Sequence, residues 1–242
     1  MIDIEICCNS RASAEAALAG GAWRIELCRD LECGGLTPSA ADIDFCVNHL
    51  GLRTYVLVRS RPGDFTYTAD ELEEMLRTIR LCADIGATGV VCGCLDPREP
   101  RRVSQPALQR LVDAAAGMEF TFHRAFDEVE SPLEEIRTVE RCGCTRVLTS
   151  GCAASAPEGA ATIRELAASS SVGIMAGAGV TPANVGRLIL DTGVAEVHAS
   201  CKMPLPGGGM QTSADEVRRL IAGVRRVDPS FTDLITNPTT QS

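Results

Sequence analysis

Short strand-like runs alternate with helical stretches along almost the whole chain, and this alternation limits the folds that the sequence can adopt. The strand candidates lie at about 3–7, 23–28, 54–59, 89–93, 119–123, 145–149, 172–177 and 194–199. Eight strands, each followed by a helix, within about 225 residues are typical of a single-domain (β/α)8 barrel of the TIM type. A doubly wound open sheet alternates in the same way, so the count alone leaves both folds open.

No shift in composition along the chain marks a second domain. We therefore predict one barrel domain over residues 1–227 and a loose polar tail at 228–242, which contains Pro229 and Pro238. Capping residues predict where several helices begin, and they are listed here in chain order: Ser39, Thr68, Ser131 (with Glu134 at capping-box spacing) and Thr181.

The composition is that of an ordinary globular protein, with 45% hydrophobic and 23% charged residues. The net charge of −9 argues against nucleic acid or an anionic membrane as a partner, although a few arginines could still hold a small anion. The sequence has no signal-peptide pattern and no apolar run long enough for a transmembrane helix. Its twelve cysteines should therefore be reduced thiols, and we predict a cytoplasmic protein.

Alternation within the predicted strands separates an aliphatic face from a polar one. On parallel strands both faces are normally covered, so the polar face should converge on the barrel interior. The residues predicted to face inward are Glu5, Arg24, Glu26, Arg59, His123, Glu196 and His198. Buried ions must be paired, hydrated or bound to a ligand, which leaves two interpretations: a structural ion network or a functional cavity.

The segment 121–127, TFHRAFD, fits the second interpretation. It sets His123 at the end of the fifth strand, on the inward face, with Arg124 and Asp127 in the loop above it. His198 takes the corresponding place at the end of the eighth strand. A neutral imidazole near pH 7 can transfer protons or bind metal, although a lone histidine is often only a packed core residue.

An enzyme is one function that these residues predict. Arginines and a glycine turn at the strand ends would bind a small anionic metabolite, including a phosphorylated one, and the residues concerned are Arg59, Arg61, Thr149, Ser150, Gly177 and Gly179. His123 or Glu26 would act as general base, and His198 or Arg124 would stabilise negative charge. Isomerase, aldolase or lyase chemistry would suit such a site. No organic cofactor is predicted.

Motifs along the chain resemble those of the CutC family of copper homeostasis proteins. They are EICCNS, RIELC, GGLTPS, RSRPGDFTY, TFHRAFD, RVLTSG, IMAGAGV and EVHAS, and the resemblance runs from about residue 3 to 225. It implies a cytoplasmic (β/α)8 barrel that self-associates as a dimer or tetramer and is linked to copper tolerance. The family's usual RPRGGDF reads RSRPGDF at residues 59–65 here, and the segment after EVHAS looks shorter than in relatives.

The resemblance also implies a copper(I) site at the cysteines that end the first two strands, which correspond to Cys7 and Cys28. Both are at positions predicted to face inward on adjacent strands, and copper(I) prefers thiolates. Free cysteine is also a common buried core residue, so simple packing remains an alternative. We predict copper(I) binding at these two cysteines as the function, with the enzyme as the alternative.

Overall fold

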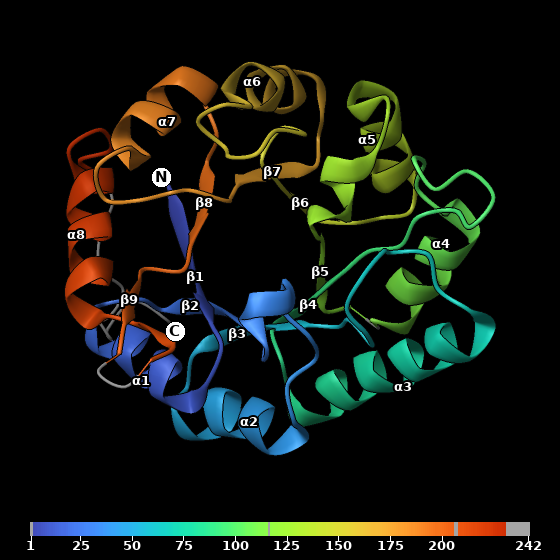
Figure 1. Ribbon diagram of the computed structural model, residues 1–242, viewed down its shortest axis with the longest axis horizontal. Coiled ribbons are helices and arrows are strands. Elements are labelled where there is room, and N and C mark those ends of the chain that lie inside the picture. Colours follow the sequence, from blue (N-terminus) through green and yellow to red (C-terminus); the bar gives the residue numbers. More distant parts are fainter. Residues whose placement is uncertain (1, 116, 206–207, 231–242) are drawn as a thin grey trace.

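The computed structural model describes residues 2–115, 117–205 and 208–230, and these residues form a closed barrel of parallel strands inside a ring of helices (Figure 1). Each strand pairs with the next, and the last pairs with the first. The barrel strands are β1 (Asp3–Cys8), β2 (Arg24–Leu27), β3 (Arg53–Leu57), β4 (Gly89–Cys92), β5 (Glu119–Phe122), β6 (Arg146–Thr149), β7 (Gly173–Ala176) and β8 (Glu196–Ala199). The barrel is therefore confirmed, and the open doubly wound sheet is excluded.

The helices alternate with these strands and cover the outside of the barrel (Figure 1). They are α1 (Arg11–Ala19), α2 (Ala40–Asp44), α3 (Ala69–Ile85), α4 (Gln105–Ala114), α5 (Pro132–Arg141), α6 (Ala160–Ser169), α7 (Val185–Thr192) and α8 (Ala214–Arg225). Shorter helical turns occur at η1 (Leu31–Cys33), η2 (Phe45–His49) and η3 (Arg124–Glu128). Within the described parts of the chain, no helix combines the length and apolarity needed to cross a membrane.

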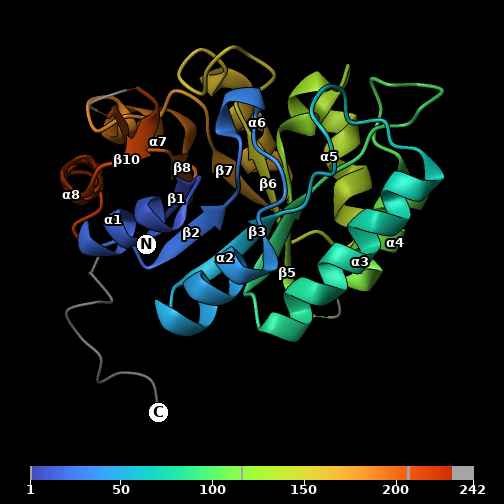
Figure 2. The same ribbon diagram turned by 60° about the horizontal axis from the view of Figure 1, so that its bottom comes forward.

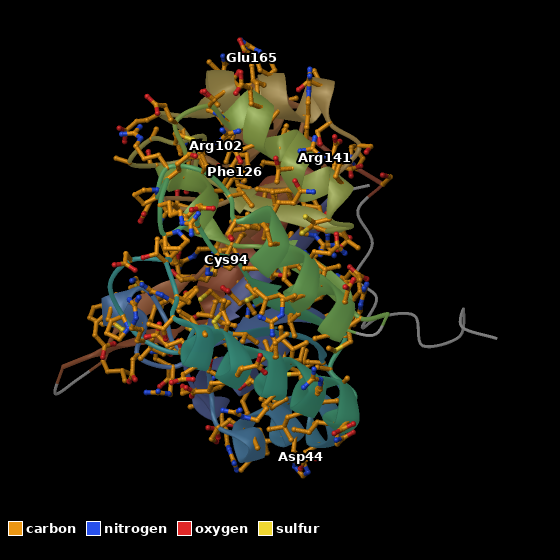
Figure 3. The ribbon with its side chains drawn as sticks, turned by 90° about the vertical axis from the view of Figure 1, so that its right-hand side faces the viewer. Asp44, Cys94, Arg102, Phe126, Arg141 and Glu165 are labelled. Carbon is orange, nitrogen blue, oxygen red and sulfur yellow. The ribbon has the colours of Figure 1, made fainter. Side chains whose placement is uncertain are left out.

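Alternation along the strands divides the core as the sequence predicts. In β1, Ile4 and Ile6 pack with the helices in the outer layer, whereas Cys7 packs inside the barrel with Tyr55 and Leu57. In a side view, Asp44 and Glu165 lie at the outer edges of the molecule, and Cys94 and Phe126 lie between them (Figure 3). There Asp44 and Glu165 are exposed, and Cys94 and Phe126 are buried.

Helix starts follow the capping signals at some positions and not at others. The Thr68 side chain caps α3 in a reciprocal capping box with Glu71, and Ser39 caps α2. The helix α5 begins after Ser131, but the Ser131 side chain makes no capping bond. The start predicted at Thr181 is wrong, because Asn184 bonds back to this turn and α7 begins only at Val185.

After β8 the chain forms a hairpin that the sequence pattern does not predict. Its strands are β9 (Lys202–Pro204) and β10 (Met210–Thr212), and β10 lies beside α1 (Figure 2). Strands of three residues are too short to show a periodicity. The predicted tail begins at Asp228, which accepts a hydrogen bond from the backbone N–H of Ile2 at 2.8 Å, but residues 231–242 of that tail lie outside the described residues.

Candidate functional site

A cavity of about 740 Å³ lies at the carboxyl ends of the barrel strands. This is the end at which barrels of this class carry their sites. Its lining residues come from the ends of several strands and include Cys7, Glu26, Cys28, Arg59, His123 and His198. The structure thus brings together residues that are up to 209 positions apart in the chain (Cys7 to Glu216).

The two cysteines named in the sequence analysis lie side by side on the cavity wall. The Sγ atoms of Cys7 and Cys28 are 3.9 Å apart, and both side chains are buried. The register of β1 and β2 pairs Cys7 with Glu26, which puts Cys28 just beyond the pair on the same face. The contact with Cys28, burial and the nearby Glu26 carboxylate all raise the pKa of the Cys7 thiol well above its usual value.

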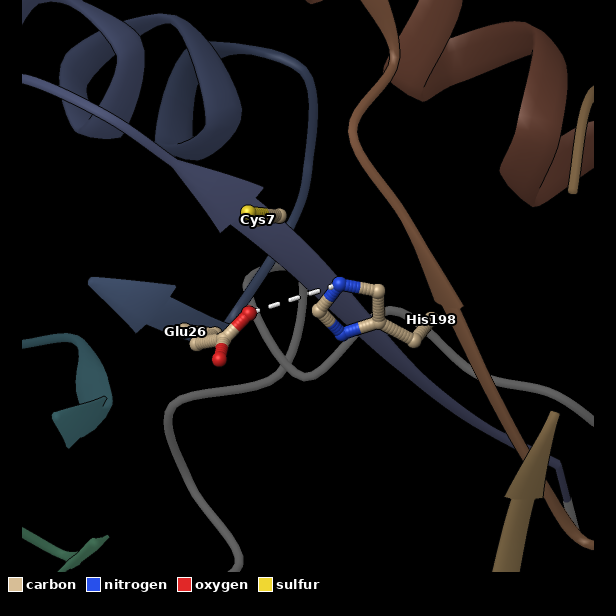
Figure 4. A group of neighbouring side chains, drawn as sticks. All are labelled: Cys7, Glu26 and His198. Atoms are coloured by element: carbon tan, nitrogen blue, oxygen red, sulfur yellow. Dashed lines mark ion pairs between the residues drawn. The ribbon is translucent and has the colours of Figure 1, made fainter. Parts of the chain in front are cut away.

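Beside the thiols, His198 lies between the carboxylates of Glu5 and Glu26, and Figure 4 draws its contact with Glu26. Its Nδ1 is 2.9 Å from Glu5 and its Nε2 is 3.4 Å from Glu26. Burial alone would lower the pKa of His198, but the hydrogen bond to Glu5 and the charge of Glu26 outweigh it and raise that pKa. Burial raises the pKa of Glu26. One ligand atom each from Cys7, Glu26 and His198 lie within 4.8 Å of one another.

Below this layer an ion network fills the barrel. Arg24, which is 1% exposed, donates to Glu5 at 2.9 Å and to Glu196 at 2.5 Å. Arg146 also reaches Glu196, at 2.6 Å, and it bonds to Glu119 at 3.0 Å. The inward charges therefore divide into two groups: Glu5, Arg24 and Glu196 belong to a paired network, whereas Glu26, Arg59, His123 and His198 line the cavity above it.

Sequence reasoning missed Arg146 and Glu119 in this network. The sequence could have placed Glu119 on the inner face, because it lies four residues before His123 and side chains alternate along a strand. Tyr55 was missed as well; its hydroxyl donates to Glu119 at 2.7 Å, and its ring lies under the guanidinium of Arg24 at 4.7 Å.

Beyond the ends of β3 and β5, Arg59 and His123 are both buried. The Nδ1 of His123 accepts a hydrogen bond from the backbone N–H of Ala125 at 3.2 Å. Burial, with a contribution from the charge of Arg59, lowers the pKa of His123 to about 3. The guanidinium of Arg59 donates to the backbone carbonyls of Cys33, Gly35 and Gly63.

Arg124, Thr149 and Ser150 converge on one carboxylate, that of Asp127. Thr149 Oγ1 donates to it at 2.5 Å, the Ser150 hydroxyl at 2.9 Å, and Arg124 Nε at 2.7 Å. Arg124 also lines the rim of the cavity, but Thr149 and Ser150 do not line it. Because their hydroxyls are occupied by Asp127, we do not retain these two residues in the proposed ligand site.

Arg61 is not among the residues that line the cavity. Its side chain is bonded to carboxylates in its own loop and in α3 instead. Its guanidinium meets Glu71 at 2.7 Å and Asp64 at 2.9 Å. In the turn after β7, Gly179 lines the cavity with φ +72°, whereas Gly177 packs beneath Leu148, where a Cβ would lie 2.5 Å from Leu148 Cδ1. Arg61 and Gly177 therefore lie apart from the group formed by Glu26, His123, His198 and Gly179.

The fold and the site together define a class of protein: a (β/α)8 barrel with a deep cavity at the carboxyl ends of its strands, one wall of which carries a thiol pair. Comparison with known proteins gives the family. The CutC family model matches residues 2–203, and the chain belongs to this family. The match ends at residue 203, about 22 residues before residue 225, where the resemblance predicted from the sequence ends.

Relatives agree with this assignment. The chain is 44% identical over 204 residues to a family protein CutC of Xanthomonas campestris pv. campestris (strain 8004), with 84% of each chain covered. It is 41% identical over 207 residues to a CutC protein of Porphyromonas gingivalis (strain ATCC BAA-308 / W83), covering 85% of this chain and 83% of the relative. A crystal structure of a CutC protein from Streptococcus agalactiae, provisionally named a copper homeostasis protein, is also similar. It superposes with a TM-score of 0.76 at 28% identity, and the match covers 83% of this chain and 99% of that one.

Proposed function

We propose that the chain binds copper(I) as its cargo, with Cys7 and Cys28 as ligands. The observation that carries the proposal is the 3.9 Å separation of the two Sγ atoms on one cavity wall. Thiolate sulfurs lie about 2.3 Å from a first-row ion such as zinc, so two of them at a tetrahedral angle are about 3.8 Å apart. Both sulfurs can therefore contact one soft ion without a movement of the strands.

His198 and Glu26 complete the donor set. The Nε2 of His198 is on the side of Glu26 and Cys7, and its Nδ1 is held by the buried carboxylate of Glu5. A carboxylate behind a ligating histidine orients the ring and increases its basicity, which is a recurrent arrangement in metal sites. Imidazole also suits copper, whereas the Glu26 carboxylate is a harder ligand and serves better to balance charge.

Binding must displace protons. The pKa of the Cys7 thiol is raised well above its usual value, so the metal-free protein holds this thiol protonated at neutral pH. The pKa of His198 is also raised, and the ring must be neutral in order to bind a metal. The proposed site therefore binds copper(I) more tightly as pH rises.

An anaerobic titration of copper(I) in competition with bicinchoninate tests the proposal. The wild-type protein is expected to take up one tightly bound equivalent, and the Cys7→Ser/Cys28→Ser variant is expected to lose it. Cys142→Ser/Cys152→Ser is a matched control, because it also removes two thiols and neither of them lines the cavity. Unchanged affinity in the Cys7→Ser/Cys28→Ser variant would exclude this site.

The proposal places the protein in a reducing compartment such as the cytoplasm, where its free thiols persist. Self-association as a dimer or tetramer, which the family resemblance implies, is part of the same proposal. Sedimentation of the metal-free and copper-loaded protein checks it, and a monomer under both conditions would contradict it.

A second function is favoured by the size of the cavity. A volume of about 740 Å³ far exceeds what one ion needs and falls in the range of pockets for small organic molecules. We propose as the alternative an enzyme that acts on a small anionic metabolite. Glu26, whose pKa is raised by burial, suits the role of general base better than His123, whose pKa of about 3 keeps it neutral. Turnover of a metabolite library by metal-free protein, and its loss in Glu26→Gln, tests this alternative.

A further inference from the structure

The cavity has two chemically different sides. Four thiols line the cavity: Cys7, Cys28 and Cys201 follow or end β1, β2 and β8, and Cys33 lies in η1 after β2. A second side is formed by residues that follow β3 and β5, and it carries the nitrogen groups of Arg59 and His123. Copper(I) binding by thiols makes no use of this second side.

The backbone determines which nitrogen of His123 carries the proton. Nδ1 accepts the N–H of Ala125 at 3.2 Å, so in the neutral ring the hydrogen resides on Nε2. The ring stays neutral at physiological pH, because its pKa is lowered to about 3. Among the described residues, no partner accepts from Nε2, and the side chain is only 4% exposed. His123 thus offers a buried N–H donor that is unsatisfied.

Arg59 offers a second donor of the same kind. Its Nη atoms donate to backbone carbonyls, but its Nε has no acceptor in the part of the chain that the structure describes. The side chain is 5% exposed, and within the described residues no carboxylate forms an ion pair with it. Glu128, at the rim of the same cavity, is the acidic group whose pKa is affected by the charge of Arg59. An unmade hydrogen bond at a buried donor is costly, and a charged donor costs more.

Phe65 packs against both groups. Its ring lies 4.7 Å from the guanidinium carbon of Arg59 and 4.8 Å from the ring of His123. Phe65 itself is half-buried and lines the cavity together with Arg59 and His123. An aromatic ring accepts no conventional hydrogen bond, so a ligand that reaches these donors from the cavity gains two hydrogen bonds that Phe65 does not supply.

We infer that this side of the cavity binds a small organic acid, whose carboxylate accepts hydrogen bonds from Nε2–H of His123 and Nε–H of Arg59. Two unpartnered donor atoms match the two oxygens of a carboxylate, whereas a phosphate has more oxygens than these two atoms can bond. The negative charge would also compensate the buried guanidinium. This inference deepens the enzyme alternative and rests on the same cavity, but it requires neither copper nor turnover.

Nuclear magnetic resonance of the three histidines tests the inference on the unaltered protein. Protein labelled with ¹⁵N-histidine would be titrated with sodium pyruvate and with sodium succinate, and with sodium phosphate at equal ionic strength. We expect Nε2–H of His123 to be visible before addition and to shift saturably with both carboxylates. His49 serves as the internal control, because it is exposed on the outer surface and stacks on Phe45. The same result is expected in the Cys7→Ser/Cys28→Ser variant.

Variants then separate binding from folding. His123→Phe should weaken pyruvate binding about tenfold or more, because it removes a donor to a charged acceptor, whereas His123→Gln should recover part of the affinity. A proton on Nδ1, a shift that His49 shares, a response to phosphate that equals the response to carboxylates, or no saturable shift at all would each overturn the inference. A pyruvate response that persists in a variant without copper binding would support the inference, because the acid would then bind independently of the thiols.

Discussion

Replacing Arg24 by methionine tests whether the buried ion network holds the barrel together. Arg24 is 1% exposed and lies 2.9 Å from Glu5, which is fully buried. Burial raises the pKa of Glu5, but Arg24 and His198 outweigh burial and hold that pKa at about 2, below its usual value of 4.5. Methionine roughly preserves the packing volume and removes the charge, so the variant leaves Glu5 without its main counter-ion.

The magnitude follows from the protonation of Glu5. A folded variant can neutralise Glu5 by protonation, and this costs about 3.4 kcal/mol at about pH 7, because that pH is about 2.5 units above the usual carboxyl pKa of 4.5. His198, still 2.9 Å from Glu5, offsets part of this cost, whereas Glu196 loses its 2.5 Å bond to Arg24. We therefore expect the free energy of unfolding to fall by about 3 kcal/mol.

The loss should depend on pH with a definite sign. In the wild type the depressed pKa of Glu5 contributes stability above pH 4.5, and this contribution is lost as pH falls toward 2. In Arg24→Met the folded pKa of Glu5 rises above 4.5, so the variant carries a penalty near neutral pH that fades as pH falls. The difference between the two proteins should shrink by up to about 1.4 kcal/mol per pH unit between about pH 7 and pH 5.

Urea unfolding at about pH 7 and pH 5 measures both quantities. Arg187→Met is the matched control, because Arg187 is 80% exposed and, among the residues that the structure describes, its side chain pairs only with Asp191 on its own helix. It should cost less than about 0.5 kcal/mol. A loss below about 1 kcal/mol in Arg24→Met, or a loss that is the same at both pH values, would refute the reasoning.

Three further outcomes are expected. The apparent affinity for copper(I), measured by bicinchoninate competition, should rise about tenfold per pH unit for each proton displaced, because the pKa of Cys7 is raised; a pH-independent affinity would contradict this. Thr68→Ala should lower the free energy of unfolding by about 1 kcal/mol in urea, because it removes the capping box with Glu71, and no change would show that the cap is dispensable. Asp127→Ala should cost about 2 kcal/mol by the same measurement, because the Thr149 and Ser150 donors lose their acceptor; a neutral variant would refute that role.

The barrel could be predicted because its signals are local. Each strand is a short apolar run bounded by turn or capping residues, and the predicted β4 and β5 ranges agree with the observed strands to within one residue. The errors occur where a tertiary contact replaces a local signal. The Asn184 side chain closes the turn at Thr181 and delays α7, and the β9–β10 hairpin is too short to carry a periodic pattern.

For the site, the parity of residues along each strand was sufficient to place Glu26, His123 and His198 on the inner face, because the side-chain period of a strand is two residues. The sequence by itself therefore determined the fold, the inward face and the family motifs. Only the tertiary structure decided how deep in the barrel each inward-facing side chain lies. Strand stagger sets Glu5 and Arg24 in a closed ion network and leaves Cys7 and Cys28 at the cavity. Side-chain pairing is likewise decided only by the tertiary structure: Arg61 lies two residues from Arg59, but Asp64 in its loop and Glu71 in α3 hold it outside the cavity.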